Sequence, residues 1–453
     1  MNIVVVGDGK VGLAITAQLS SEGHDLTVVD SNSKVLEQSV EQFDVMVVHG
    51  NGASLPTLRE ANADQADLLI AATSADEINL LTCILARRVG AKHTIARVRN
   101  PEYAEQLVLM REELGLSMTI NPELSAAKEI YNLLQFPSFL QRDTFAKGKV
   151  EIVELKVKAG SRLDDLPLNK LHKILSVKVL VCAVRRGSET FIPSGFFVLK
   201  ENDRIFVTAA SRDLVKLMHN LNIKTQKIHS CMIIGGSRIA YYLSKMLIDS
   251  GISVKIVEKN PERCVVLSEM LPEAIVIEGD GSKQRLLLEE GLDKTDAFVT
   301  LTNIDEENIF FSLYAKHVEV PHVITKISRM EYSNVIQSMG IDAPVCPKLL
   351  CATEITRYVR AMANTTGGAV ITMHELVDGR VHALEFLAGP GTKYLDNPLA
   401  DVPIKKGILI ACIIRKGRAI IPEGGNCIRR DDTLIIVIQG DRIIVNLNDI
   451  FEN

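Results

Sequence analysis

The strongest constraint on this chain is a pattern that occurs near its start and again half a chain later. The first copy reads NIVVVGDGKVGLAITAQLSSEGHDLTVVD, and the second reads SCMIIGGSRIAYYLSKMLIDSGISVKIVEK. Gly235 follows Gly7 by 228 positions (235 − 7 = 228), and Glu258 follows Asp30 by the same interval (258 − 30 = 228). A short apolar strand, a glycine-rich turn, an amphipathic helix and a second strand ending in an acid therefore occur twice.

This order of elements is typical of a nucleotide-binding site. The turn brings backbone N–H groups and a helix N-terminus up to a pyrophosphate, and the acid about 20 residues further on accepts hydrogen bonds from a ribose. A second copy of such a device in one chain favours a sensor built by duplication over a simple enzyme.

In the first copy the three glycines have separate predicted roles. Gly7 permits the tight turn, Gly9 lets the diphosphate approach, and Gly12 lets the helix pack on the strand. Asp30 favours a free 2′-hydroxyl, hence NAD over NADP, because it would repel a 2′-phosphate. The loop residues between them are assigned to the same site: Asp8, Lys10 and Val11. Two alternatives stay open, namely an empty fold whose glycines serve packing alone, and Asp30 as a plain polar strand end.

Further candidates follow the later strands of the first copy. Asn51, between Gly50 and Gly52, follows the third strand, and Thr73 and Ser74 follow the fourth. Ligands of open α/β sheets bind at this carboxyl edge of the strands. Arg97 closes the fifth strand, where its charge could neutralise a phosphate. The alternative for each of these residues is an ordinary loop role.

The second copy departs from the ideal spacing. Ser237 stands where Gly9 stood and Ala240 where Gly12 stood, so a Cβ at the close-approach position should crowd a pyrophosphate. Arg238 could add positive charge to this site. We therefore expect the second site to bind a nucleotide more weakly than the first site, or to prefer a different nucleotide. The candidate residues of this second site are Gly235, Gly236, Ser237, Arg238, Ile239, Glu258 and Asp280.

The repeat extends far beyond the glycines. HGNGASLPTLREANADQADLLIAATSADEINLL matches EGDGSKQRLLLEEGLDKTDAFVTLTNIDEENIF. Further on, TIARVRNPEY matches ITKISRMEY, which places Arg97 opposite Lys326. The alternation of apolar strand and 3.6-periodic helix predicts a doubly wound parallel sheet in each half. Shorter strands with RRG…IPSG and RKG…IPEG turns follow, which indicates a small α+β domain after each sheet. The predicted domains are 1–124, 140–225, 229–348 and 366–453, with a polar junction between the halves near 222–229.

Composition excludes several classes of protein. The 453 residues are 47% hydrophobic with no Trp, which fits Val- and Ile-rich sheets buried on both faces. A net charge of −5 argues against a nucleic-acid binder, which needs a basic face. We expect no N-terminal signal and no membrane span, because a strand begins directly after Met1 and no apolar stretch is long enough. The eight cysteines lack the spacing of a zinc site, so we expect no metal.

With these motifs in view, the chain resembles the cytosolic regulatory subunits of bacterial Trk potassium-uptake systems, which consist of tandem RCK (regulator of potassium conductance) N- and C-domains. The resemblance covers essentially the whole chain and includes GDGKVG, GNGAS, GDGSK and the RRG…IPSG and RKG…IPEG turns. It implies two Rossmann-like domains, each followed by an RCK C-terminal domain. The GGSRIA loop departs from the pattern and leaves the ligand of the second site open.

The resemblance also implies ligands and partners. The protein would bind NAD⁺ or NADH and also ATP or ADP, and no nucleic acid. It would form a homo-oligomeric ring, a tetramer, in the cytoplasm at the inner face of the plasma membrane. There it would gate an integral membrane potassium channel subunit of the Trk type by rearrangement of the ring.

Two other functions remain as alternatives. A dehydrogenase also begins with GxGxxG and an acid, but it needs a proton-transfer group at the nicotinamide and a substrate pocket. None of the ten histidines has a recognisable catalytic setting, so we expect no catalytic residue and no enzyme activity. A nucleotide sensor for a different transporter is the third possibility.

One helix is a candidate for a contact between the two N-domains. The segment 125–136, which ends before Pro137, follows the first sheet and is predicted to swap onto, or pack across, a pair of N-domains. The alternative is simple packing within its own domain.

Overall fold

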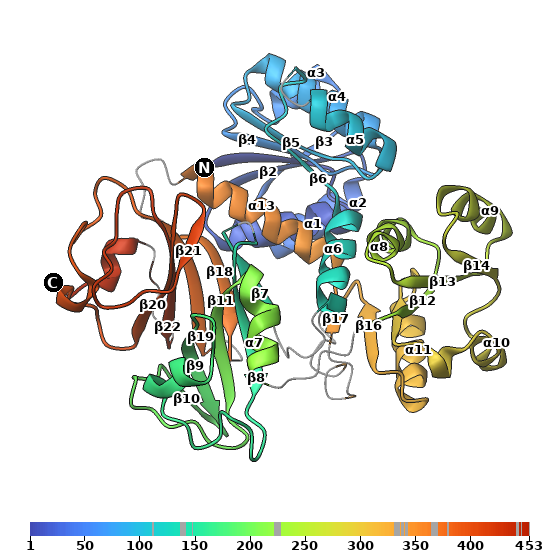
Figure 1. Cartoon of the computed structure of the whole chain (residues 1–453). Coiled ribbons are helices and arrows are strands. Elements are labelled where there is room, and N and C mark those ends of the chain that lie inside the picture. Colours follow the sequence, from blue (N-terminus) through green and yellow to red (C-terminus); the bar gives the residue numbers. More distant parts are fainter. Residues whose placement is uncertain are drawn as a thin grey trace. The chain divides into compact units, whose positions relative to one another are not determined.

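A computed structural model gives the fold (Figure 1). It describes residues 1–110, 113–135, 142–146, 148–221, 228–329, 336, 339, 343–363, 370–377, 380–440, 444 and 446–452. The chain forms two compact units, one of Met1–Gln135 with Lys227–Thr356 and one of Phe136–Gln226 with Arg357–Asn453. None of the helices in these described ranges is long and apolar enough to cross a membrane.

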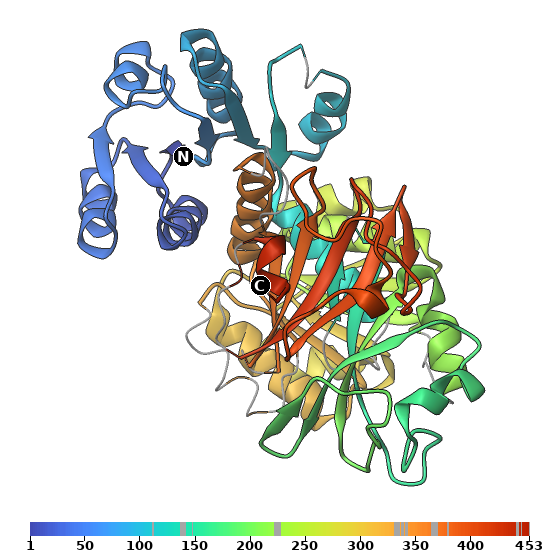
Figure 2. The same ribbon diagram turned by 90° about the vertical axis from the view of Figure 1, so that its left-hand side faces the viewer.

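The first unit holds two parallel sheets, and the first sheet has the order β3-β2-β1-β4-β5-β6. Its strands are β1 (Asn2–Val6), β2 (Asp25–Asp30), β3 (Met46–His49), β4 (Leu68–Ala71), β5 (His93–Arg97) and β6 (Met118–Ile120). The central strands consist of buried Val, Ile, Leu and Ala because helices cover both faces of the sheet, as the blue part of Figure 2 shows. The helices are α1 (Lys10–Ser21), α2 (Ser33–Gln42), α3 (Leu55–Glu60), α4 (Asp76–Val89), α5 (Pro101–Met110) and α6 (Pro122–Gln135).

The second sheet repeats the first with the order β14-β13-β12-β15-β16-β17. Its strands are β12 (Ser230–Ile234), β13 (Ser253–Glu258), β14 (Ile275–Glu278), β15 (Ala297–Thr300), β16 (His322–Lys326) and β17 (Ala343–Val345). Its helices are α8 (Arg238–Asp249), α9 (Pro261–Met270), α10 (Gln284–Glu289), α11 (Asp305–His317) and α13 (Pro347–Ala363), with a 3₁₀ turn at Leu292–Lys294. In each sheet the order reverses beside the first strand, which is the place where such folds bind ligands. The predicted doubly wound sheets are confirmed.

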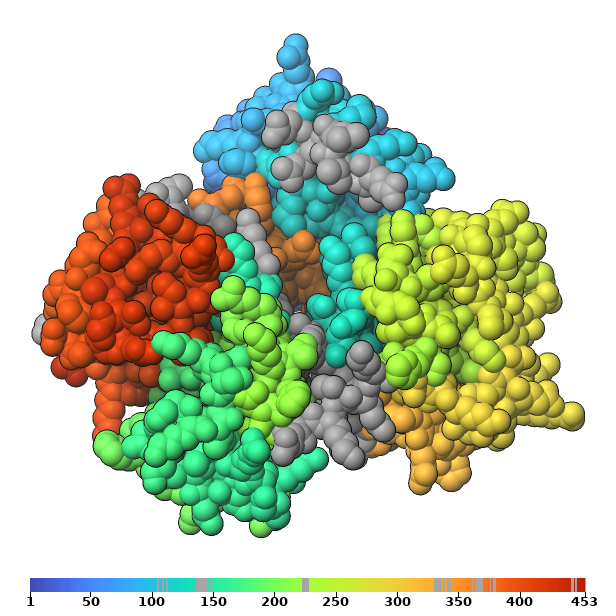
Figure 3. Space-filling view, in the orientation of Figure 1, coloured from blue at the N-terminus to red at the C-terminus, as the bar shows by residue number. Residues whose placement is uncertain are grey.

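Helix α6 packs on the second parallel sheet rather than only on the first. Its buried side chains Ala127 and Ile130 belong to one core with Leu243 of α8 and the inner strands of the second sheet. The contact between α6 and α8 is visible in Figure 3, where the teal and yellow-green atoms meet. The prediction of a helix that packs across the N-domain pair is therefore confirmed. Its first residue is Pro122, earlier than predicted, because proline is well tolerated at the first helical position; Phe136 lies outside the described residues.

The second unit contains two antiparallel sheets with the orders β10-β9-β11-β8-β7 and β18-β19-β22-β20-β21. The first is built from β7 (Arg142–Phe145), β8 (Val150–Lys156), β9 (Leu180–Arg186), β10 (Glu189–Phe191) and β11 (Arg204–Ala210), with α7 (Leu214–Asn220) and 3₁₀ turns at Leu168–Lys173 and Ser211–Asp213. The second is built from β18 (Val370–Leu376), β19 (Val381–Leu387), β20 (Ile408–Arg415), β21 (Arg418–Ile420) and β22 (Thr433–Gln439), with 3₁₀ turns at Leu399–Asp401 and Leu447–Ile450.

The two antiparallel sheets share one core. Phe206 and Cys182 of the first sheet lie in the same buried cluster as Val437 and Cys412 of the second. The predicted small α+β domains and the buried state of these two thiols are confirmed. The four domain ranges given above stay predictions, and their limits at 140, 225 and 366, like most of the junction at 222–229, lie outside the described residues.

Candidate nucleotide sites at the carboxyl edges of the parallel sheets

The first glycine-rich turn connects β1 to α1 at the edge where the strands end. The Gly7 N–H donates to the carbonyl of Val29 at 2.8 Å, and the Gly7 φ of +91° is a conformation that favours glycine. A Cβ at Gly7 would lie 2.6 Å from the Thr73 nitrogen, and a Cβ at Gly12 would lie 1.9 Å from the Gly7 carbonyl oxygen. These two glycines are therefore required by the fold itself, for the turn and the close helix packing that were predicted.

Gly9 differs from its two neighbours. A Cβ at Gly9 would meet nothing within 4 Å, and the residue is exposed at the start of α1. No side chain caps α1, so no side-chain acceptor takes up the free N–H groups at the start of this helix. The protein does not need glycine here for its own packing, whereas a closely approaching pyrophosphate would.

Asp30 holds the turn in place. One carboxylate oxygen accepts the Asp8 N–H at 2.7 Å, and the other accepts the Asn32 N–H at 2.8 Å. Each oxygen keeps a second lone pair, so a ribose hydroxyl can still donate to it. The acid thus positions the loop, and its contact with a ribose stays a prediction.

The Asp8 side chain lies inside the fold, only 1% exposed. One of its oxygens accepts a hydrogen bond from the Ser39 hydroxyl of α2, and the other has no hydrogen-bond partner among the described residues. Burial raises the pKa of Asp8 to about 6, the bond from Ser39 opposes this rise, and the nearby Asp30 charge adds to it. Asp8 is therefore a buried titratable group within the loop rather than an exposed ligand contact, and Lys10 is the exposed charge of this turn.

The other predicted residues of the first site lie at the same edge in different settings. Asn51 is exposed, and its side chain accepts the Ala53 N–H at 3.0 Å. The Thr73 N–H and hydroxyl both donate to the Asn79 side-chain oxygen, at 2.8 and 2.6 Å. The Ser74 carbonyl accepts a bond from Arg99. Val11 is buried at the start of α1.

Asn79 is a residue that the sequence reasoning missed. It is fully buried, and its amide group donates to the carbonyls of Thr73 and Arg97, at 3.2 and 2.9 Å. Asn308 makes the matching bonds to Thr302 and Lys326 in the second half. The recurrence of Asn at this position of the repeat was the signal that could have identified it.

Arg97 is not a free cation. Its guanidinium lies 3.7 Å from the Glu123 carboxylate, its side chain is largely buried, and burial lowers its pKa. The Glu123 charge also acts on Lys326 of the second sheet, whose pKa burial lowers and the nearby Lys10 lowers further. Arg97 therefore belongs to a charge cluster between the two parallel sheets, and its contact with a phosphate stays a prediction.

The second turn keeps the acid-to-loop contact but changes its surroundings. Glu258 accepts the Gly236 N–H at 2.6 Å and the Asn260 N–H at 2.7 Å. The Ser237 hydroxyl accepts the Ala240 N–H at 3.3 Å and so caps α8. This cap occupies a helix N-terminus that stays uncapped in the first site.

A further cation, Arg263, distinguishes the second turn. Its Nε donates to the Gly236 carbonyl at 2.6 Å, and its pKa is lowered by burial and by the charge of the exposed Arg238. Sequence reasoning missed Arg263, although the repeat places it opposite Val35 of the first half. The remaining predicted residues are also placed: Gly235 has φ +95°, Ile239 is buried, and the Asp280 pKa is lowered by a hydrogen bond from Ser282.

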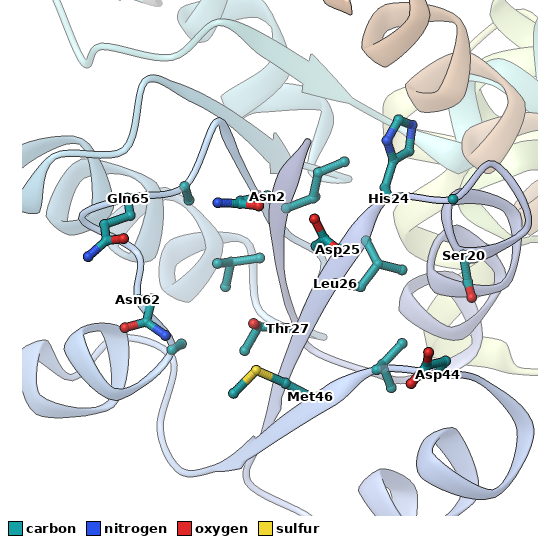
Figure 4. Close-up of a pocket in the computed structure, with 16 residues that line it drawn as sticks. Asn2, Ser20, His24, Asp25, Leu26, Thr27, Asp44, Met46, Asn62 and Gln65 are labelled. Carbon is teal, nitrogen blue, oxygen red and sulfur yellow. The ribbon is translucent and has the colours of Figure 1, made fainter.

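A hollow of about 640 Å³ lies at the opposite, amino edge of the first sheet (Figure 4). Thr27, Met46 and Ala61 are among the residues that line it. The second sheet has Lys255 and Glu290 at the positions of Thr27 and Ala61, and their side chains pair at 3.3 Å. Because it lies away from the glycine-rich turn, this hollow is not the nucleotide site. Among the described residues, no group of three or more His, Cys, Asp or Glu side chains is arranged to hold a metal ion.

Comparison with known proteins identifies the family. The sequence model of the TrkA-N domain matches residues 3–122 and 231–347, and that of the TrkA-C domain matches residues 152–222. A Trk system potassium uptake protein TrkA homolog of Archaeoglobus fulgidus is 31% identical over 443 residues, which cover 98% of each chain. The Trk system potassium uptake protein TrkA of Vibrio alginolyticus is 30% identical over 459 residues, covering 100% of this chain and 99% of that protein.

A solved structure has the same fold. The structure titled "GsuK channel bound to NAD" matches with a TM-score of 0.63 at 18% identity, covering 97% of this chain and 76% of the other. The fold and both carboxyl-edge sites thus define a protein of tandem, duplicated parallel-sheet domains with antiparallel companions. The chain belongs to the TrkA family of Trk system potassium uptake proteins.

Proposed function

We propose that this protein is the nucleotide-sensing regulatory subunit of a potassium-uptake system and that its first site binds NAD⁺ or NADH. The observation that carries the proposal is the contrast between Gly9 and the other two glycines of the turn. Gly7 and Gly12 are required by packing, whereas Gly9 opens onto an uncapped helix N-terminus beside the Asp30 carboxylate. This is the geometry that a dinucleotide with a free 2′-hydroxyl requires.

The second site takes a nucleotide of different charge, ADP or ATP. Ser237 crowds the close-approach position and caps α8, which weakens the seat for a dinucleotide pyrophosphate. Arg238 and Arg263 place two guanidinium groups near each other there, where the first half has Lys10 and Val35. Additional phosphate charge would relieve the repulsion between these two cations.

The protein acts in the cytoplasm as a homo-oligomeric ring, a tetramer, on the inner face of the membrane, where it gates a channel subunit of the Trk type. The relatives' names as potassium uptake proteins support this role. Exposed apolar side chains at matching positions of the two halves support self-association: Leu81 of α4 is 44% exposed and Phe310 of α11 is 61% exposed. A ligand shifts such a ring only by binding one arrangement better than another.

An enzyme is the competing function. Among the described residues of the first site, Asp30, Thr73, Asn79 and Arg97 are each held by protein partners, which favours a binding role over a reacting one. An assay of NADH oxidation with a panel of 2-oxo acids should give no turnover, and turnover would argue for a dehydrogenase instead.

Calorimetric titration of NADH tests the first site. We expect Asp30→Ala to lower NADH affinity at least tenfold, because the variant loses the ribose acceptor and the acid that positions the turn. Asp25→Ala, at the opposite end of the same strand, is the matched control and should bind as the wild type does. Equal affinity in the wild type and Asp30→Ala would mean that the site is misassigned.

Affinity purification from native membranes tests the partner. The full chain should recover an integral membrane potassium transporter subunit, and mass spectrometry identifies it. Recovery of a transporter for another solute would favour the alternative of a sensor for a different system.

A further inference from the structure

One buried hydroxyl joins the elements that carry the two candidate nucleotide sites. Tyr242 of α8 donates its hydroxyl to the Arg99 carbonyl at 3.2 Å, and it accepts the Asn121 side-chain amide at 3.0 Å. Tyr242 is 8% exposed, and its ring lies in the core that α6 shares with the second sheet. A buried pair of hydrogen bonds is costly to break, so this contact restricts the positions that both sides adopt.

On the first-site side, Arg99 is tied to the loop that follows β4. Its backbone N–H donates to the Asp76 carboxylate at 2.8 Å, and its guanidinium lies 3.5 Å from the other Asp76 oxygen. The guanidinium also donates to the carbonyl of Ser74, one of the residues at the carboxyl edge. A ligand that shifts this loop therefore shifts the carbonyl that Tyr242 contacts.

On the second-site side, Tyr242 lies about one turn into the helix that begins at the second glycine-rich loop. Arg238 is the first residue of α8, and the preceding Ser237 caps it. Because a helix moves as a unit, a ligand that displaces the cap shifts the hydroxyl of Tyr242 as well.

We propose that the Tyr242 hydroxyl couples the two nucleotide sites, so that occupancy of either site changes the affinity of the other. This inference rests on the proposed function, because it assumes that both sites bind nucleotides. Binding free energies are linked reciprocally, so the effect has the same size in both directions. Tyr242 acts here as a positioning residue, because it contacts the two sites through Arg99 and α8 rather than through a ligand.

The hydrogen bond between Tyr242 and Arg99 has no counterpart at the matching positions of the repeat. The repeat places Ala14 of α1 opposite Tyr242, and Ser328 opposite Arg99. A methyl group cannot form a hydrogen bond, so α1 cannot make the matching contact with the second sheet. A single substitution at Tyr242 therefore removes the hydrogen bond to Arg99 with no counterpart in the other half to replace it.

The test measures a coupling factor on the full chain. Titration of the Glu258→Ala variant measures the first site alone, and titration of the Asp30→Ala variant measures the second site alone. The Asp30→Ala variant is titrated with NADH and with ADP, and the nucleotide that binds more tightly becomes the probe for the second site. The wild-type isotherm is then fitted with both single-site dissociation constants held fixed and one coupling factor. We expect the factor to differ from one by at least about fivefold in the wild type, within the usual range for coupled sites, and to fall within about twofold of one in Tyr242→Phe.

Controls separate this idea from simpler explanations. Tyr241→Phe should keep the wild-type factor, because Tyr241 packs edge-on against Tyr242 at 5.4 Å but takes no part in the bonds described. The ring of Tyr242 is retained in Tyr242→Phe, and its thermal melting midpoint checks that the core is intact. A factor of one in the wild type, or an unchanged factor in Tyr242→Phe, overturns the inference. Loss of binding in both single-site variants would instead refute the proposed function itself.

Discussion

At the scale of single residues, the structure separates glycines that the fold needs from one that the protein's own packing does not require. A sequence motif gives the three glycines of GDGKVG equal weight. The distances from an added Cβ to neighbouring atoms differ between them. A side chain at Gly12 would collide with the Gly7 carbonyl, and a side chain at Gly9 would enter open space. Stability and binding therefore respond differently at two positions that are only three residues apart.

Two alanine substitutions test this separation. Gly12→Ala should destabilise the protein by about 3 kcal/mol, since a Cβ at 1.9 Å from a backbone oxygen forces the turn to move. Gly9→Ala should cost about 1 kcal/mol at most, the loss of a favourable helix N-cap, yet weaken NADH binding at least tenfold. Thermal melting and calorimetry measure the two effects, and equal stability losses in both variants would contradict the assignment.

A second residue-scale prediction concerns pH and Asp8. The folded-state pKa of about 6 is above the unfolded value of 3.8, so the folded protein binds this proton more tightly. The protonated Asp8 carboxyl therefore contributes about 3 kcal/mol to the free energy of unfolding below about pH 4. This contribution is lost as the pH rises through 6. Asp8→Asn removes the charge and keeps an acceptor for Ser39. Its melting midpoint should match the wild type near pH 4 and exceed it at pH 7.

Equal midpoint differences at both pH values would show that Asp8 is not the buried titrating group. The second half provides an internal comparison, because Gly236 and Leu267 stand at the positions of Asp8 and Ser39. No matching carboxylate exists in that loop.

At the scale of elements, each antiparallel sheet contains the same arginine–aspartate pair, which we call the polar clip, next to the RRG or RKG turn. The RRG and RKG turns place Arg186 and Arg415 where each makes paired bonds to a buried aspartate, Asp203 and Asp432, at 2.7 to 2.9 Å. Each arginine also reaches the carbonyl of a residue before the aspartate, Val198 in the first copy. The turns and the Asp before the last strand are therefore one structural device, used twice.

Asp203→Ala should destabilise the second compact unit by about 3 kcal/mol. The loss leaves the guanidinium of Arg186 and the Lys200 N–H without their acceptor, and partial exposure of Arg186 keeps the cost at the lower end for buried pairs. Glu201→Ala, at an exposed neighbouring position, is the control and should change stability little. Urea unfolding followed by circular dichroism measures both, and a near-zero effect of Asp203→Ala would count against the clip.

At the scale of the whole molecule, duplication produced two parallel sheets that are similar in topology and different in chemistry. One turn is open and uncapped, and the other is capped by Ser237 and flanked by Arg263. The helix that leaves the first sheet joins the core of the second. The two halves therefore share packing through which a ligand bound in one half would act on the other.

Self-association is the prediction that belongs to this scale. Phe310→Asp should lower the oligomeric state measured by light scattering after size exclusion, because it places a charge on an exposed apolar side chain of α11. Val215→Asp, on an equally exposed side chain of α7, is the control. An unchanged oligomer in Phe310→Asp, or an equal effect of both variants, would mean that α11 is not an assembly surface.

Much of the fold and of the first site was predictable because the determining interactions are local. The turn at Gly7, the helix after it and the acid at Asp30 lie within 30 residues and follow from spacing. Asn79 and Arg263 were missed because their roles depend on which carbonyl lies opposite, and spacing does not encode that. The predicted segment began at residue 125, whereas α6 begins at Pro122, because proline is well tolerated at the first position of a helix.

By itself, the sequence determined the duplicated order of elements, the parallel and antiparallel sheets and the two glycine-rich turns, since these arise from short-range periodicity and backbone geometry. Only the tertiary structure decided which carboxylate is buried and what joins the two halves. Asp8 faces Ser39 31 positions away, and Tyr242 reaches a carbonyl 143 positions away. Contacts at such separations depend on how packed surfaces fit together, and no local pattern records that.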